Sequence, residues 1–295
     1  MPKPVAFIGI GVIGGYMARH LAEKGFAVTV FNRTREKADA WLKENGAKGA
    51  GGHRLAKTPQ DAAKGAALVF ACVGADPDVR DVTTGFEGAF SGMDQGAVFA
   101  DHTTASAVLA RALDVEARKR GFGFLDAPVS GGEAGAKTGQ LSVMVGGAEA
   151  DFNKAEPAIR CYAKMVKRIG PAGSGQLTKM VNQICLAGTI EGLAEALHFG
   201  LSAGLDMEKA IEVLAKGAAQ SWQMDNRAKT MMAGEFDFGF AVNWMRKDLT
   251  MVLAEAKRLG IELPVAALVD RFYAEVQKMG GARQDTSSLI RRYRG

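Results

Sequence analysis

One lysine and two amide side chains fall on the same face of a helical segment in the second half of the chain. Asn182 and Gln183 follow Lys179 by three and four residues, a spacing that brings side chains together on an α-helix. Leu177 and Met180 add an apolar stripe beside them. A lysine held near a core and a cofactor has a lowered pKa, which suits proton transfer near neutral pH. An amphipathic helix with a solvated lysine would show the same spacing, so the other motifs must decide.

A glycine-rich turn near the start of the chain matches a binding site for dinucleotide phosphates. Gly9, Gly11 and Gly14 form GxGxxG, with Val12 and Ile13 inside the motif, directly after a strand-like run. The first glycine permits a tight turn, the second lets a pyrophosphate approach, and the third lets the next helix pack on the sheet. Free N–H groups at the helix N-terminus then meet the phosphates. We predict that these residues bind a dinucleotide; the alternative is a glycine turn in a plain α/β domain.

The end of the second predicted strand indicates which dinucleotide binds. Asn32, Arg33 and Thr34 stand where a carboxylate would hold the ribose hydroxyls of NAD. No acidic residue is present there to repel a 2′-phosphate, while Arg33 can pair with it and its neighbours can donate hydrogen bonds. The triplet favours NADP(H), with NAD(H) possible if Arg33 is only a solvated loop cation.

A second glycine-rich loop follows a later strand. Ser130, Gly131 and Gly132 come shortly after the strand-like residues 122–126, and the loop is expected to continue to Gly139. Consecutive glycines after a serine expose backbone N–H groups, which form a concavity for an anion such as a carboxylate. The segment is therefore a candidate substrate site.

The elements that must position these residues change in character along the chain. The first half alternates strands and amphipathic helices, which predicts an α/β Rossmann domain with a doubly wound, mostly parallel sheet. After Gly175, helices dominate. We expect an NADP(H)-binding Rossmann domain at residues 1–172 and an all-helical substrate and dimerisation domain at residues 173–295. Strands are predicted at 5–8, 26–31, 68–73, 97–100, 122–126 and 141–145, and the later helices at 177–201, 207–215, 222–232, 242–259 and 265–279.

Composition narrows the classes of protein further. Cys72, Cys161 and Cys185 lie far apart without a CxxC, so neither a disulfide framework nor a metal site is expected. No run of about 18 apolar residues and no secretory leader is present, which favours a cytoplasmic protein without a membrane partner. The net charge is +5, but the densest basic run, at residues 291–294, is expected to be a solvated tail. No nucleic-acid partner is predicted, because no larger basic patch with aromatics is evident.

Four motifs, spread in order over nearly the whole chain, can be compared with those of known protein families. They are FIGIGVIG at 7–14, DAPVSGG at 126–132, GPAGSGQLTKMVNQ at 170–183 and RKDL at 246–249. Together they resemble the β-hydroxyacid dehydrogenase family, which includes 3-hydroxyisobutyrate dehydrogenases, tartronate semialdehyde reductases and glyoxylate/succinic semialdehyde reductases. The 3-hydroxyisobutyrate branch typically carries Asp where this chain has Asn32. The triplet is instead similar to the NADPH-dependent glyoxylate and succinic semialdehyde reductase branch.

The resemblance implies a role for individual residues. Lys179 matches the catalytic acid/base, and Lys247 matches a contact to the nicotinamide end of the cofactor. His102 matches no catalytic position, and Trp244 is a less familiar residue in the pocket segment, which leaves the substrate unnamed. Substrate binding is implied for Ser130, Gly131, Gly132, Asn182, Gln183, Phe240 and Asp248, and further cofactor contacts for Val73, Gly74 and Thr104.

The activity implied is hydride transfer between NADP(H) and a small hydroxy acid or aldehyde acid. The substrate would be 3-hydroxyisobutyrate-, glyoxylate- or succinic semialdehyde-like. Lys179 would protonate the developing alkoxide in reduction or take the hydroxyl proton in oxidation. The family also implies an active site in the cleft between the domains, and a homodimer or homotetramer.

Three other functions fit parts of the sequence. Imine reductases share the architecture but usually replace the lysine, so Lys179 argues against them. Enzymes like 6-phosphogluconate dehydrogenase often have His-Asn after the lysine, where this chain has Asn182-Gln183. A non-catalytic NADP(H)-binding module would be expected to lose the lysine or to carry an appended module.

Overall fold

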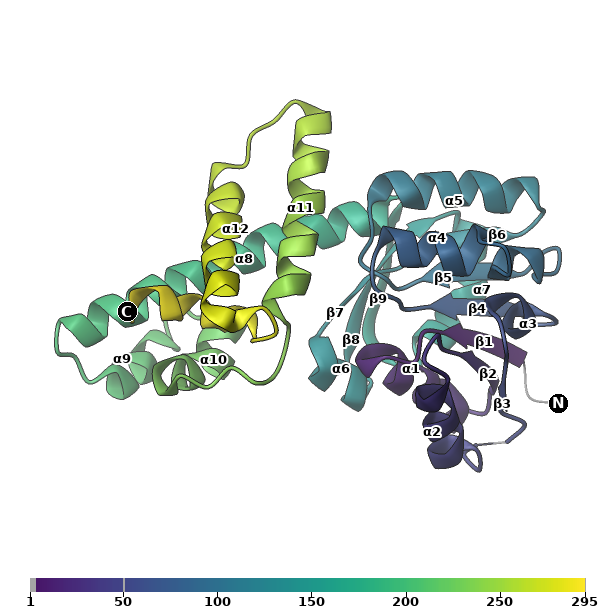
Figure 1. Ribbon diagram of the computed structural model, residues 1–295, viewed down its shortest axis with the longest axis horizontal. Coiled ribbons are helices and arrows are strands. Elements are labelled where there is room, and N and C mark those ends of the chain that lie inside the picture. Colours follow the sequence, from purple (N-terminus) through teal and green to yellow (C-terminus); the bar gives the residue numbers. More distant parts are fainter. Residues whose placement is uncertain (1–3, 50, 295) are drawn as a thin grey trace. The chain divides into compact units, whose positions relative to one another are not determined.

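The chain forms two compact units that divide within one long helix. The computed structural model describes residues 4–49 and 51–294 (Figure 1). The units are Met1–Lys179 and Met180–Gly295, and helix α8 (Ser174–Ser202) runs from the first into the second. The boundary predicted from composition, at 172/173, lies just before this helix begins.

The first unit is built on a mostly parallel sheet. In the part of the chain that is described, nine strands follow the order β3-β2-β1-β4-β5-β6-β8-β7, with β9 paired to β8. The six strands from β3 to β6 are parallel and have the Rossmann order, while β8 runs antiparallel to β6 and β7. Their bounds are β1 (Pro4–Ile8), β2 (Ala27–Phe31), β3 (Arg54–Leu55), β4 (Leu68–Ala71), β5 (Val98–Asp101), β6 (Gly123–Asp126), β7 (Val129–Ser130), β8 (Leu141–Gly147) and β9 (Ala163–Gly170).

Helices cover both faces of this sheet because its strands are apolar on both sides (Figure 1). Phe7 belongs to a core that includes Met17 of α1, whereas the next residue, Ile8, belongs to a core that includes Val79 of α4 and Leu109 of α5. One face carries α1 (Val12–Glu23), α2 (Arg35–Asn45) and α7 (Glu149–Ile159), and the other α3 (Pro59–Ala63), α4 (Asp76–Thr84) and α5 (Ala107–Lys119). The predicted fold class is confirmed.

The second unit is helical. Its core gathers Ile190 and Leu197 of α8 with Met231, Leu249 and Tyr273 from three further helices. Besides α8 it contains α9 (Met207–Leu214), α10 (Trp222–Ala233), α11 (Val242–Leu259), α12 (Pro264–Val276), the π-helical segment η2 (Gln277–Gly281) and the 3₁₀ helix η3 (Thr286–Tyr293). The sequence predicted α11 with the same bounds.

Helix α8 is apolar along most of its length. Among the described helices it is the one long and apolar enough to cross a membrane by length and composition. The core helix of a globular unit meets the same criterion, and Ala187, Leu193 and Ala194 of α8 are buried in the core of the second unit. The finding is weak evidence for a membrane.

Two sequence expectations are wrong. Residues 133–139 are not a loop, because helix α6 (Gly132–Thr138) occupies them and ends at Gly139, which has φ +69°. The C-terminal basic run is not a solvated tail, because the Arg292 side chain is 14% exposed and lies 2.6 Å from the carboxylate of Glu275. Its guanidinium also lies 3.3 Å above the centre of the Phe272 ring. The Arg292 side chain therefore packs against the helical unit through an ion pair and a cation–π contact.

Candidate active site

The phosphate-binding turn has a separate steric reason for each of its three glycines. Gly9 has φ +94°, and a Cβ there would collide with the carbonyl oxygen of Cys72. A Cβ at Gly14 would collide with the carbonyl oxygen of Gly9, so the third glycine lets α1 approach the turn. At Gly11 no atom lies within 4 Å of the position of a Cβ. This open space, beside a helix start without a side-chain cap or an acidic residue in its first turn, fits a pyrophosphate.

The predicted specificity triplet is partly held by the protein itself. The amide oxygen of Asn32 accepts a hydrogen bond from the Ile10 N–H at 2.9 Å, and its nitrogen donates to the Thr34 carbonyl at 2.8 Å. Asn32 therefore joins the phosphate turn to the loop after β2. Arg33 is 86% exposed and pairs with Asp78 of α4 at 3.0 Å, an arrangement that the sequence did not predict. An exposed pair of this kind contributes about 0–1 kcal/mol, so an anionic ligand can replace Asp78.

The loops after β4 and β5 are hydrogen-bonded to each other. The Val73 N–H donates to the Thr103 hydroxyl at 2.9 Å, and the Thr103 N–H donates to Asp101 at 2.9 Å. Gly74 and Thr104, the other predicted cofactor contacts in these loops, are half-buried next to these bonds. All of these residues lie at the carboxyl ends of the parallel strands, where open α/β sheets bind their ligands.

The serine–glycine turn is fixed beside the phosphate-binding helix. Ser130 ends β7, and Gly131 and Gly132 have φ +126° and +60°, conformations that favour glycine. Helix α6 then begins, and its Ala136 carbonyl accepts a hydrogen bond from His20 of α1 at 3.0 Å. The two predicted glycine-rich segments thus lie at the starts of α1 and α6, two helices that contact each other.

The amides that follow Lys179 are part of a hydrogen-bonded chain in the second unit. Asn182 donates to the side-chain oxygen of Gln183 at 2.7 Å, and Gln183 donates to Asp248 of α11 at 2.7 Å. The other carboxylate oxygen of Asp248 lies 3.1 Å from the Lys247 ammonium. Gln183 and Asp248 are 1% and 2% exposed. The structure therefore brings together four of the residues predicted from two separate motifs.

Lys179 itself is buried, with 8% of its surface exposed. It lies on α8 one turn before Gln183, so the predicted helix face is present. The alternative of a solvated lysine is wrong.

The segment before α11 is fixed through its backbone. The half-buried Phe240 donates its N–H to Asp285 at 2.9 Å, and its carbonyl accepts from the Thr286 N–H at 2.9 Å. Trp244 is half exposed on the first turn of α11, with the Lys247 ammonium 5.6 Å from the centre of its ring. Phe240 and Trp244 thus lie near each other along the same segment as the Lys247–Asp248 pair.

Three buried titratable groups lie at the ends of β5 and β6. Burial raises the pKa of Asp101 to about 7 and that of Asp126 to about 6. Burial lowers the pKa of His102 to about 4. Its Nδ1 lies 2.7 Å from the Ala127 carbonyl and must donate, so Nε2 accepts the hydroxyl of Tyr162 at 2.8 Å. His102 is therefore a neutral, buried residue bonded within the first unit.

Sequence reasoning missed two polar residues beside the candidate site. Asp126 and Gln176 both lie within motifs that the sequence analysis identified, but no role was predicted for either residue. Asp126 accepts hydrogen bonds from the Gly173 and Gln176 N–H groups at 2.7 and 2.8 Å. An aspartate that ends a strand, together with a glutamine in the first turn of a helix, was the available signal.

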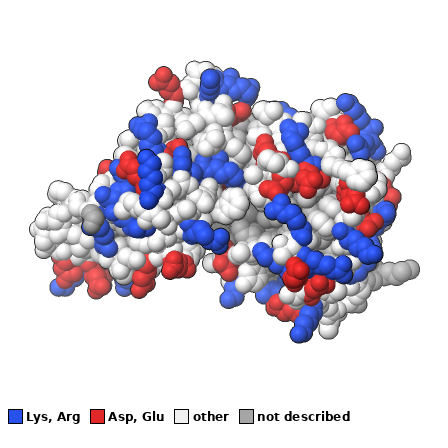
Figure 2. Space-filling model, viewed as in Figure 1, with Lys and Arg blue, Asp and Glu red and all other residues white. Residues whose placement is uncertain are grey.

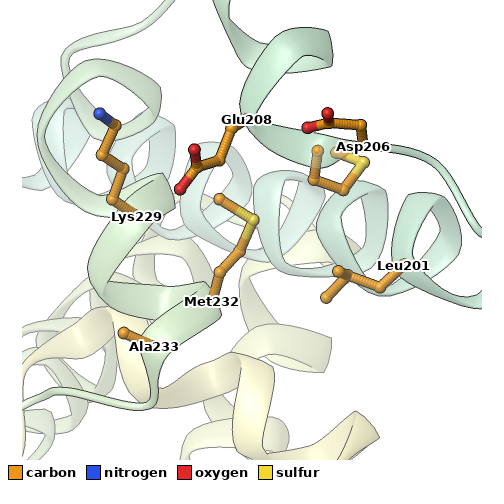
Figure 3. A pocket seen from close by; sticks show the side chains of 7 residues that line it. Leu201, Asp206, Glu208, Lys229, Met232 and Ala233 are labelled. Atoms are coloured by element: carbon orange, nitrogen blue, oxygen red, sulfur yellow. The ribbon is translucent and has the colours of Figure 1, made fainter.

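We also searched the rest of the described residues for a second binding site or a metal site. A hollow of about 340 Å³ in the second unit is lined by none of the predicted site residues (Figure 3). No group of three His, Cys, Asp or Glu side chains within residues 4–49 and 51–294 could hold a metal. Acidic and basic side chains are interspersed on the face shown in Figure 2. The hollow is lined by Leu201, Asp206, Met207, Glu208, Lys229, Met232 and Ala233.

Comparison with known protein families shows to which family the chain belongs. Residues 4–170 match the NAD binding domain of 6-phosphogluconate dehydrogenase, and residues 173–293 match the NAD-binding domain of NADP-dependent 3-hydroxyisobutyrate dehydrogenase. The chain belongs to the β-hydroxyacid dehydrogenase family. It is an oxidoreductase of the 3-hydroxyisobutyrate dehydrogenase type, with an NAD(P)-binding Rossmann domain, as the four motifs predicted.

Individual relatives match along nearly their whole length. An uncharacterised oxidoreductase of Shewanella frigidimarina is 57% identical, over 98% of this chain and 97% of its own. The 2-(hydroxymethyl)glutarate dehydrogenase of Eubacterium barkeri is 31% identical, over 97% of this chain and 93% of its own. The structure of Mycobacterium tuberculosis 3-hydroxyisobutyrate dehydrogenase with L-serine matches with a TM-score of 0.89 at 25% identity, covering both chains completely.

The contrast between two glycines of the phosphate turn gives a first prediction. Gly11→Ala adds a methyl group to open space, so we expect an unchanged melting temperature but at least about tenfold weaker NADPH binding, because the methyl blocks the pyrophosphate. Gly14→Ala forces a backbone collision, so we expect a loss of at least about 2 kcal/mol in the free energy of unfolding. Thermal melts and fluorescence titration with NADPH measure both. Unweakened NADPH binding by Gly11→Ala would contradict the assignment of this turn.

The buried histidine gives a prediction about stability in acid. The unfolded chain takes up a proton at His102 near pH 6.5, but the folded chain does so only near pH 4, so this group's contribution to stability is lost as pH falls through that window. Between pH 6.5 and 5 the free energy of unfolding of the wild type should fall by about 1.6 kcal/mol more than that of His102→Phe. Urea unfolding at each pH measures the difference. Tyr162→Phe keeps the imidazole but removes the hydrogen bond to its neutral Nε2, so its pH dependence should lie between those of the wild type and His102→Phe. Equal slopes for His102→Phe and the wild type would disprove the neutral assignment.

Proposed function

We propose that this enzyme transfers a hydride between NADP(H) and a small hydroxy acid or aldehyde acid, with Lys179 as general acid and base. The observation that carries the proposal is the burial of Lys179 on the helix face that also holds Asn182 and Gln183. A buried amine next to fixed amides can protonate an alkoxide and hold the substrate oxygen at the same time. The class includes 3-hydroxyisobutyrate-, glyoxylate- and succinic semialdehyde-like substrates.

The residues of the first unit fit NADP(H) as cofactor. The nicotinamide supplies the hydride in reduction and accepts it in oxidation. Gly9, Gly11 and the first turn of α1 would hold the pyrophosphate, and Arg33 would exchange Asp78 for the 2′-phosphate. Position 32 carries an uncharged amide, which does not repel that phosphate. The matched family model of an NADP-dependent dehydrogenase supports this preference, and NAD(H) stays possible.

Two groups of the protein would bind the two polar parts of the substrate, its carboxylate and its reacting oxygen. The backbone N–H groups at Gly131 and Gly132 would bind the carboxylate, because both glycines have a positive φ and the position of a Cβ at Gly132 is open space. Lys179 would hold the oxygen that changes between hydroxyl and carbonyl, with Asn182 orienting it. The relatives support such a substrate, since one acts on 2-(hydroxymethyl)glutarate and one was solved with L-serine.

We also propose a homodimer or homotetramer in a reducing, cytoplasmic setting. Large apolar side chains of the second unit lie exposed, including Phe199 at 72% and Val213 at 74%, and an assembly through this unit would cover them. The three cysteines are free thiols, which fits a reducing compartment.

Replacement of the proposed acid/base gives the decisive functional test. Lys179→Ala should lower kcat by about 10²–10⁴-fold, because no other group would deliver the proton, while NADPH affinity should stay within about twofold. Steady-state assays with a panel of aldehyde acids, hydroxy acids and imines, with both cofactors, measure the effect. Lys154→Ala, which removes an exposed lysine of the same unit, is the control. Wild-type turnover in Lys179→Ala would refute the role, and no turnover of any compound by the wild type would favour a binding module.

The cofactor preference can be tested at one isosteric position. Asn32→Asp keeps the acceptor for the Ile10 N–H but places a negative charge beside the 2′-phosphate. The ratio of kcat/KM with NADPH to that with NADH should fall at least about tenfold, since a like charge costs more than about 1.4 kcal/mol there. Asn226→Asp, on α10 in the second unit, should leave the ratio unchanged. An unchanged ratio in Asn32→Asp would contradict the assignment.

A further inference from the structure

The first turn of α8 is fastened to the carboxyl edge of the sheet by two buried polar side chains. We infer that Asp126 and Gln176 are positioning residues, which set the place of Lys179 relative to the loops proposed to contact the cofactor. The inference rests on the proposed role of Lys179 and assigns to two further residues the task of holding it.

Asp126 supplies the N-terminal cap of α8 from a strand. Its two carboxylate oxygens accept the Gly173 N–H at 2.7 Å and the Gln176 N–H at 2.8 Å. N–H groups in the first turn of a helix have no partner within the helix, and a nearby residue of the same segment usually caps them. Here the cap comes from the end of β6, so the start of the helix is fixed to the sheet and not only to the preceding loop.

Two glycines permit this close approach. A Cβ at Gly146 of β8 would collide with the carboxylate of Asp126. A Cβ at Gly175 would collide with the backbone carbonyls of Asp126 and Met144. The backbone of the first turn of α8 therefore lies close to β6 and β8, and the Asp126 carboxylate fills the space at the contact.

Gln176 makes the second attachment, to the loop after β5. Its side-chain oxygen accepts the Ala105 N–H at 3.0 Å, and its nitrogen donates to the Thr103 carbonyl at 2.7 Å. Thr103 in turn accepts the Val73 N–H at 2.9 Å. The glutamine is 1% exposed, so these bonds are shielded from water. It thus connects α8 to both loops that carry the proposed cofactor contacts Val73, Gly74 and Thr104.

Lys179 is near enough to these attachments for them to control its position. It follows Gln176 by three residues, which is a rise of about 4.5 Å along the helix. A displacement of about 1 Å at a reacting group can slow a reaction by about 10²-fold. Loss of the Gln176 bonds should therefore slow the step that needs Lys179 without weakening cofactor binding to the same extent.

A double-mutant cycle tests this inference. We would measure single-turnover NADPH oxidation, with the best substrate of the panel, in the wild type, Gln176→Met, Lys179→Ala and the double variant. Gln176→Met should slow the wild-type reaction by about 10–100-fold but the Lys179→Ala reaction by less than about twofold. The dissociation constant for NADPH should stay within about twofold, and the primary deuterium isotope effect with labelled NADPH should rise as the chemical step becomes limiting.

The control and a second variant separate positioning from general destabilisation. Asn45→Leu removes another buried amide bond of the first unit, from Asn45 to the Trp41 carbonyl at 2.8 Å, and should leave the rate unchanged. Asp126→Asn keeps the volume and one acceptor, and should repeat the dependence on Lys179 if Gln176→Met fails to fold. Equal slowing in both backgrounds, or an unchanged rate in the foldable variant, would overturn the inference alone. Full activity in Lys179→Ala would overturn the proposed function and the inference with it.

Discussion

The buried start of α8 is the constraint on which the candidate site depends. Its first N–H groups lie against the sheet, where water cannot satisfy them, and a buried N–H without a partner costs about 1–3 kcal/mol. The carboxylate of Asp126 satisfies two of them and places negative charge at the positive end of the helix. Burial raises the pKa of Asp126 to about 6, because the charged carboxylate is shielded from water. The two N–H bonds offset part of the cost of this burial, so the aspartate and the helix start stabilise each other.

The second unit also contains a buried carboxylate that binds polar groups on neighbouring helices. Asp248 is buried, and its two oxygens face Gln183 at 2.7 Å and Lys247 at 3.1 Å. One carboxylate thus orients an amide of α8 and a cation of α11. In both units a buried acid fixes the polar groups around α8, and the groups proposed to meet substrate are supported by rigid helices.

Much of this organisation was predictable from local sequence. Six of the nine described strands of the Rossmann domain follow from apolar runs, whereas β3, β7 and β9 were not predicted. The turn at Gly9, Gly11 and Gly14 follows from glycine spacing. The pairing of Arg33 with Asp78 was not predictable, because the two residues are 45 positions apart and no local pattern connects them. The same holds for Asp126 and Gln176, whose roles arise only when β6 and α8 meet. Helix α6 was missed because its four glycines, from Gly131 to Gly139, resemble a loop when tertiary contacts with α1 are unknown.

A crystal structure with NADP+ and a hydroxy acid bound tests the central claim most directly. The account predicts the Lys179 ammonium within about 2.6–3.2 Å of the substrate hydroxyl oxygen, with the hydrogen bonds of Asp126 and Gln176 to α8 and its neighbouring loop retained. A hydroxyl oxygen held by another side chain, with Lys179 turned away from the substrate, would contradict it.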